Sequence, residues 1–283
     1  MNLPSIAGIT PGIPFDQYLQ LPGLSASKLK KLMKSPLAFK WDQDHPDTSS
    51  SPAMALGTAV HTAILEPHRM KTDYVLWDQG DKRGKAWTEF KEIHVDKQIL
   101  SAAEFDQVKA MRSSLLGYAP AARYLQDGVA EVTIQWKDPS GRAMRGRVDW
   151  ITVIDGQLVL VDLKTTRDAS ARKFFASSFD LGYHIQFALY VDGWYYLTGE
   201  TPRFVVLAVE SSAPYEPAVF DVTEDVLVRG HDDYTALLET LQSCELANTW
   251  PPRAEAEQPL LLPAWARAKD DEDVSDIGLD LSA

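Results

Sequence analysis

The sequence has very little cysteine and no long apolar run. Cys244 is the one cysteine among 283 residues, which excludes an internal disulfide and a cysteine-based zinc or iron–sulfur site. The longest apolar runs, such as Leu158 to Val161, fall far short of the roughly 20 residues that a membrane span needs. The first residues also lack the basic and then apolar pattern of a secretory signal. We therefore expect a cytoplasmic protein that does not contact a membrane.

Positive charge is also scarce, because 28 Lys and Arg residues stand against 40 Asp and Glu, a formal net charge of −12. Part of this excess lies at the end of the chain, where six acidic residues accompany a single lysine from Lys269 onward, which leaves −7 for the rest. A global field that attracts nucleic acid is thereby excluded. Local basic patches could still bind nucleic acid, and so could cations bound by carboxylates, because such cations reverse the sign of the local charge.

Turn residues and apolar periodicity divide the chain into three regions. The first 22 residues hold four prolines and predict an irregular lead-in, and residues 23–250 predict a single domain. Within it we expect a helical lobe over about 23–120, a sheet core over about 128–222 and a C-terminal helix over about 224–247. Residues 251–283 predict an acidic, flexible tail.

Helix signals dominate the first half of the chain. Ser25 is a candidate N-cap for a short basic helix, and small apolar residues predict a second helix over Ala53 to Leu65. Ser101 and Glu104 have the spacing of a capping box, followed by an apolar pattern with helical period. The polar stretch from Asp42 to Pro52 predicts a loop.

From Ala130 onward the apolar period changes to two, which is typical of half-buried strands. Strands are predicted from there to Trp136, over about 143–153 and, after a turn at Asp155 and Gly156, over about 157–163. Two helices at about 171–178 and 183–197, strands at 204–210 and 218–222, and a last helix from Thr223 follow. This order predicts an α/β fold with a mixed central sheet flanked by helices.

Carboxylates end the apolar runs of two neighbouring predicted strands. Period-two spacing places Arg145, Arg147 and Asp149 on one face of the first strand, and Val148 and Trp150 on the other. On the second strand Asp162 and Lys164 continue the face of Leu158 and Leu160. Such partly buried charges are costly unless they are paired or bind metal. Two carboxylates and a lysine at one sheet edge are suited to metal-assisted phosphodiester hydrolysis.

Four motifs in order carry a family resemblance. Gly146-Arg147-Val148-Asp149 and Val161-Asp162-Leu163-Lys164 resemble the D-(x)n-(D/E)-x-K signature of the PDDEXK nuclease superfamily. Gly57 to His61 resembles the G-x-x-x-H motif of its RecB-like branch, and Gln186 to Tyr190 resembles the Q-x-x-x-Y motif of that branch. Ser25-Ala26-Ser27 resembles the opening of the RecE-type (exonuclease VIII) nuclease domain. The fold that this resemblance implies is a restriction-endonuclease-like core with an N-terminal helical lobe.

The resemblance implies roles for individual residues. Arg145 and Arg147, and Lys28 and Lys31 on the first basic helix, are candidate DNA contacts. The remaining roles that it implies are metal binding by His61, Asp149, Asp162 and the Leu163 carbonyl, catalysis by Asp149, Asp162, Lys164, Gln186 and Tyr190, and an auxiliary role for Glu131.

The activity that the resemblance implies is a Mg²⁺-dependent exodeoxyribonuclease, with Mn²⁺ as a substitute. Metal-activated water would attack phosphorus in line and leave a 5′-phosphate. The substrate would be an end of double-stranded DNA, degraded 5′ to 3′ to give single strands for recombination, as in phage recombination systems. A single-strand annealing recombinase is the implied partner, and related exonucleases form rings, so a homo-oligomer is also expected.

Other interpretations of the same residues stay open. The site is also consistent with a structure-specific or single-strand endonuclease, with a catalytically inactive DNA-binding or recombinase-docking scaffold, or with an enzyme acting on another phosphate ester. His61 alone would be more typical of a core histidine, and only the company of Asp149, Asp162 and Lys164 favours a metal ligand. Asp162 and Lys164 could also form a structural ion pair. Arg145 and Arg147 could equally form a solvated face.

Overall fold

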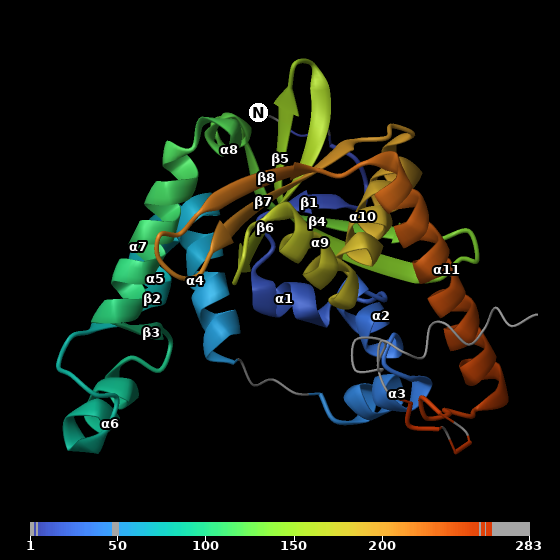
Figure 1. Cartoon of the computed structure of the whole chain (residues 1–283), viewed down its shortest axis with the longest axis horizontal. Helices are drawn as coiled ribbons and strands as arrows, with labels where there is room; N and C mark the ends of the chain where they lie inside the picture. The colour runs from blue at the N-terminus through green and yellow to red at the C-terminus, as the bar shows by residue number, and fades with distance from the viewer. Residues whose placement is uncertain (1–2, 4, 47–50, 255, 258, 262–283) are drawn as a thin grey trace, which may run out of the picture.

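The computed structural model describes residues 3, 5–46, 51–254, 256, 257 and 259–261. A mixed six-stranded sheet forms the centre of the molecule, and helices cover both of its faces (Figure 1). Neighbouring strands are antiparallel except for β6 and β7, which are parallel. Across the sheet the order is β1 (Ile9–Pro11), β4 (Gly128–Lys137), β5 (Ala143–Ile154), β6 (Gln157–Thr166), β7 (Arg203–Glu210) and β8 (Pro217–Asp221).

The three central strands form where the period-two pattern predicts them. Val132, Ile134 and Trp136 of β4 are buried on one face of the sheet. Asp155 and Gly156 both adopt positive φ, at 54° and 79°. Such a pair of residues makes the tight two-residue turn that matches the twist of a hairpin. The predicted meander of three strands is therefore confirmed.

One face of the sheet packs against α10 (Tyr183–Thr198), with α11 (Glu224–Ala247), α2 (Ala26–Leu32) and α3 (Pro36–Asp44) beside it (Figure 1). The short helix α9 (Ala171–Asp180) contributes Phe174 to the same core. Ser25 caps α2 as predicted, because its hydroxyl accepts the backbone N–H of Lys28.

The other face packs against α4 (Pro52–Leu65) and α7 (Ala102–Gly117), with the short α8 (Ala119–Ala122) at the end of α7. Ser101 and Glu104 form the predicted capping box of α7. On β6, Leu160 enters the first core and Val161 the second, so this strand is buried on both faces. The sheet is therefore packed between two apolar cores, one on each face.

A smaller unit extends from the α7 side of the molecule (Figure 1). The parallel strands β2 (Tyr74–Trp77) and β3 (Gln98–Ser101) flank α6 (Gly84–Ile93), and α5 (Met70–Asp73) precedes them. Trp77 packs edge-on against the rings of Trp87 and Phe90. No helix in the described part of the chain combines the length and the apolar character needed to cross a membrane.

Two sequence predictions for the first 45 residues are wrong. The irregular lead-in over 1–22 contains strand β1, which pairs with β4, and helix α1 (Phe15–Gln20). The predicted loop begins later than Asp42, because α3 continues to Asp44. The tail prediction for 251–283 falls largely outside the described residues.

Helix α1 is anchored to the sheet by Arg145 of β5. This side chain is only 3% exposed, and its Nη1 donates to the carbonyls of Tyr18 (2.9 Å), Leu19 (3.2 Å) and Leu21. Its guanidinium also lies over the Tyr18 ring at 5.0 Å. The expectation that Arg145 contacts DNA is therefore wrong, because the N-terminal segment covers it.

Replacing Arg145 with Met is expected to lower the free energy of unfolding by about 2–4 kcal/mol, because buried carbonyls lose their donor. Urea denaturation measures this difference. The matched control is Arg123→Met, since Arg123 forms an exposed ion pair with Asp155 and such pairs contribute about 1 kcal/mol or less. Equal losses in the two variants would contradict the anchoring role.

Candidate active site

Strands β5 and β6 separate midway along their length. Their ladder runs from Ile154↔Gln157 to Trp150↔Val161 and stops there. Beyond that point β5 pairs with β4, apart from an isolated bridge between Met144 and Leu24, and β6 pairs with β7. The residues at the point of separation are Asp149 and Asp162, so the structure brings together the two carboxylates that the sequence singles out.

Asp149 supplies a hydrogen bond where the ladder ends. Its Oδ2 accepts the backbone N–H of Leu163 at 2.8 Å. The separation also changes the face pattern of β5, because Val148 packs in the core beside α10 whereas Trp150 packs in the core beside α4. The prediction that Val148 and Trp150 share a face is therefore wrong, since strict alternation does not persist through Asp149.

Asp162 lies at the centre of a buried polar network. The residue is 2% exposed; its Oδ1 accepts Nε2 of Gln186 at 2.7 Å, and its Oδ2 lies 2.6 Å from Nζ of Lys164. The Oδ2 contact is an ion pair without good hydrogen-bond geometry. The face of β6 that carries Asp162 and Lys164 therefore lies against α10, the helix that carries Gln186.

His61 reaches the same place from α4 on the other side. Its Nδ1 lies 3.6 Å from Oδ2 of Asp149. Gly57, one turn earlier, lets the helix approach the end of β6, because a Cβ there would lie 3.3 Å from Oγ1 of Thr165. The glycine of the G-x-x-x-H motif therefore lets α4 pack closely against β6. This close packing brings the His61 imidazole to the site.

Glu131 is held in an unusual conformation beside these residues. Its φ of 51° is left-handed, which costs a non-glycine residue roughly 1 kcal/mol or more. Its Oε2 lies 2.8 Å from Nε of Arg147, and both side chains are largely buried. The Arg147 guanidinium also lies 5.1 Å from the centroid of the Phe15 ring. The structure thus pairs Arg147 within the protein, and its predicted contact with DNA has no support here.

Burial governs the ionisation of the acidic groups. Burial, with the charge of Asp149 added, raises the pKa of Glu131 to about 8 despite the nearby Arg147. Burial also raises the pKa of Asp162, against the opposing charge of Lys164. Burial lowers the pKa of Lys164, but Asp162 and Asp149 more than offset it, so the net shift is upward. Burial therefore makes ionisation of both carboxyls costly, and the cations beside them offset that cost only in part.

This donor set fits a hard divalent cation. Asp149 lies beside the His61 imidazole, and the buried Oδ2 of Asp162 lacks a well-directed hydrogen bond. Within the described residues, no group of three or more His, Cys, Asp or Glu side chains lies together in a geometry that could hold a metal ion. An open set of oxygen donors suits Mg²⁺, which keeps several of its own waters. The Leu163 carbonyl remains a predicted ligand.

Tyr190 supports the strand that carries Asp149. It is 7% exposed, and its hydroxyl accepts the backbone N–H of Arg147 at 3.4 Å. Its ring lies against Gly146, where a Cβ would be 2.7 Å from Cε1. The structure therefore gives the Q-x-x-x-Y motif two different environments, with Gln186 at Asp162 and Tyr190 beneath β5.

The lysines of α2 have separate environments. Lys28 is exposed, and Lys31 pairs with Asp42 at 2.7 Å; both remain predicted DNA contacts. Lys30, which the sequence also makes a candidate DNA contact, reaches Gln186 instead, with Nζ 3.2 Å from Oε1. A signal exists in the sequence, because Lys30 follows Ala26 by four residues and so lies on the flank of the buried stripe of the helix.

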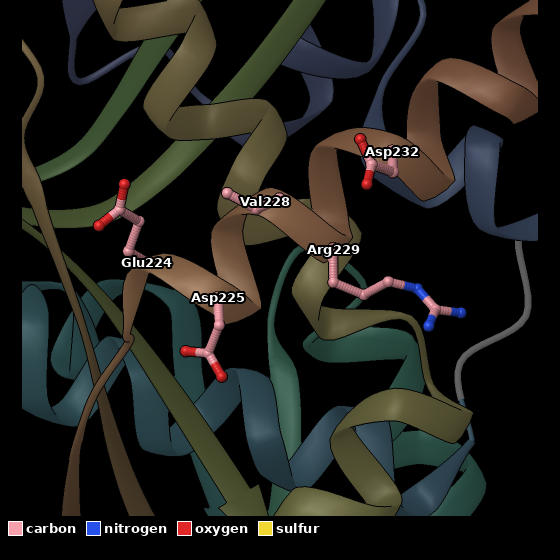
Figure 2. A pocket seen from close by; sticks show the side chains of 5 residues that line it. All are labelled: Glu224, Asp225, Val228, Arg229 and Asp232. Atoms are coloured by element: carbon pink, nitrogen blue, oxygen red, sulfur yellow. The ribbon is translucent and has the colours of Figure 1, made fainter.

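A surface hollow of about 440 Å³ lies elsewhere, over the first turns of α11 (Figure 2). Three carboxylates and a single arginine face it, which disfavours an anionic substrate. Its lining residues are Glu224, Asp225, Val228, Arg229 and Asp232. The hollow is therefore separate from the residues gathered at β5 and β6.

The sheet, its flanking helices and the residues at the separation of β5 and β6 define a PDDEXK-like fold. The chain belongs to the family described as "PDDEXK-like domain of unknown function (DUF3799)", whose model matches residues 25–259. The family and the fold together support a nuclease.

One solved structure shares this fold. A crystal structure named "Putative exonuclease" from Eubacterium rectale is 15% identical, with a TM-score of 0.60 over 97% of this chain and 99% of that one. Two others match less closely: SSO0001 (11% identity, TM-score 0.35, 78% of this chain and 81% of that one) and VC1899 from Vibrio cholerae (12%, 0.24, 83% and 58%). No curated protein matches the chain.

The raised pKa of Glu131 predicts a pH-dependent stability. A carboxyl whose folded pKa is near 8, against about 4.5 when unfolded, stabilises the fold below pH 4.5 and loses that contribution as the pH rises through 8. Relative to Glu131→Gln, the wild type is therefore expected to lose at least about 1.4 kcal/mol, the equivalent of one pKa unit, between pH 5 and 8.5. Urea denaturation at several pH values measures this. Parallel curves for the two proteins would contradict the shift.

Proposed function

We propose that this protein is a divalent-metal-dependent exodeoxyribonuclease that acts on ends of linear double-stranded DNA. The observation that carries this proposal is the meeting of Asp149, Asp162 and Lys164 at the separation of β5 and β6, with His61 beside them. Exonuclease action is supported by the name of the Eubacterium rectale structure. That chain and this one match along almost their whole lengths. The 5′ to 3′ polarity, the recombinase and the ring assembly rest on the RecE-type resemblance and remain predictions.

The residues of the chain have distinct roles in this proposal. Asp149, Asp162 and His61 would hold Mg²⁺ or Mn²⁺, which when bound lowers the pKa of water and polarises the phosphate. Asp149 is fixed by the N–H of Leu163, and Asp162 by the amide of Gln186. Lys164 holds its ammonium at the Oδ2 of Asp162, where it can orient the attacking water.

Linear and closed-circular forms of one duplex DNA test the activity directly. With Mg²⁺, loss of only the linear form is expected, and EDTA should abolish it. Linear DNA with labelled ends then gives the polarity. Degradation from 5′ to 3′ is expected to release the 5′ label first. Cutting of the circle would make an endonuclease the better account, and no cleavage of either form would favour a DNA-binding scaffold.

Asp149→Asn and Lys164→Met are expected to lower cleavage by a factor on the order of 10² or more, because the first removes a proposed metal ligand and the second removes the group that orients the reacting water. Thermal denaturation adds a readout that does not depend on cleavage. Mg²⁺ should raise the melting temperature of the wild type but not of Asp149→Asn, since a ligand stabilises only the fold that binds it.

Matched controls are available for both substitutions. Asp155→Asn makes the same chemical change in an exposed turn, and Lys137→Met does so at the exposed end of β4. Both should cleave at wild-type rates. Full activity in Asp149→Asn together with Lys164→Met would remove the basis of the assignment.

A further inference from the structure

Lys30 lies next to the polar network of the site but belongs to a different part of the chain. Its Nζ donates to Oε1 of Gln186 at 3.2 Å, and Nε2 of the same amide donates to Oδ1 of Asp162 at 2.7 Å. These contacts connect α2, α10 and β6 in one chain of hydrogen bonds. Gln186 is the central member, and its two ends face groups of opposite charge.

The chemistry of the two neighbours determines which way the amide points. A lysine ammonium only donates hydrogen bonds, and an ionised carboxylate only accepts them. The Gln186 oxygen must therefore face Lys30 and its nitrogen must face Asp162. A flipped amide would set NH₂ against ammonium and oxygen against carboxylate, so both contacts would become repulsive. This orientation follows from the partners and does not depend on telling oxygen from nitrogen.

Packing holds Lys30 in this position. Its aliphatic stem lies against Gly182, where a Cβ would be 3.0 Å from Cδ and 3.1 Å from Cγ. Gly182 has a φ of 66° and precedes α10, so the glycine both begins this helix and leaves room for the lysine. The Tyr183 ring lies beneath two ammonium groups, with its centroid 5.2 Å from Nζ of Lys30 and 4.9 Å from Nζ of Lys164.

We propose that Lys30 is a positioning residue that fixes the Gln186 amide and, through it, the orientation of the Asp162 carboxylate. Holding Oδ1 of Asp162 in the hydrogen bond to Gln186 leaves Oδ2 for the reacting centre. The helical lobe thereby contributes a second residue to the site besides His61. This inference rests on the proposed metal-dependent function of that site.

A double-mutant cycle with Lys30→Met and Gln186→Ala tests the proposal. Mn²⁺ binding to the full chain, measured by calorimetry, is the first readout because it does not need cleavage. Lys30→Met is expected to weaken Mn²⁺ binding at least threefold when Gln186 is present. In the Gln186→Ala background it should weaken it less than 1.5-fold or tighten it, since removal of a positive charge by itself favours a cation.

The rate of cleavage of linear duplex DNA is the second readout. Lys30→Met should lower kcat about tenfold with KM changed less than threefold, and should have less than a twofold effect in the Gln186→Ala background. Lys30→Arg, which keeps a cationic donor, should retain most of the wild-type rate. Lys34→Met removes an exposed lysine just beyond the same helix and should leave both readouts unchanged.

Two results would overturn the positioning role. Equal losses in the two Gln186 backgrounds would show that Lys30 acts independently of the amide, as a direct phosphate contact does, and unchanged Mn²⁺ binding in Lys30→Met would also contradict it. Failure of the nuclease proposal has a different signature, because the wild type would then bind Mn²⁺ without cleaving DNA. Thermal denaturation of each variant confirms that it is folded.

Discussion

The hydrogen bonding of the sheet at the separation of β5 and β6 is the constraint on which the site depends. A backbone N–H that leaves a ladder inside a protein needs another acceptor, because an unpaired buried group is costly. Asp149 provides that acceptor for Leu163. Its carboxylate is therefore held by the backbone of the neighbouring strand, on which Asp162 immediately precedes Leu163.

The charged groups around this point destabilise the fold, and the rest of the molecule offsets the cost. The raised pKa values of Glu131 and Asp162 show that burial outweighs the cations beside them, and Glu131 adds a left-handed backbone conformation. Apolar layers enclose the sheet on both sides, with residues such as Leu160 and Val161 of β6 facing opposite cores. Conflict between local preference and fold is typical of functional sites.

The sequence predicts the central elements well because their signals are local. Alternation predicts β4 to β6, and the capping residues Ser25 and Ser101 predict the starts of α2 and α7. Strand β1 has three residues and no pattern of its own, so only its pairing with β4 reveals it. Likewise Arg145 has the position of a solvated face residue, and nothing local indicates that α1 covers it. Period-two spacing also could not reveal the change of face at Asp149.

Few of the expected cations are free to meet nucleic acid. Arg145 binds backbone carbonyls, Arg147 pairs with Glu131, and Lys31 pairs with Asp42. Their charges are therefore used within the fold, in keeping with the net charge of −12. If the protein acts on DNA as proposed, the phosphate at the site must be neutralised chiefly by the metal held between carboxylates and by Lys164. Recognition then depends on the same buried charges as catalysis, since a bound cation inverts the local sign that the acidic chain would otherwise present.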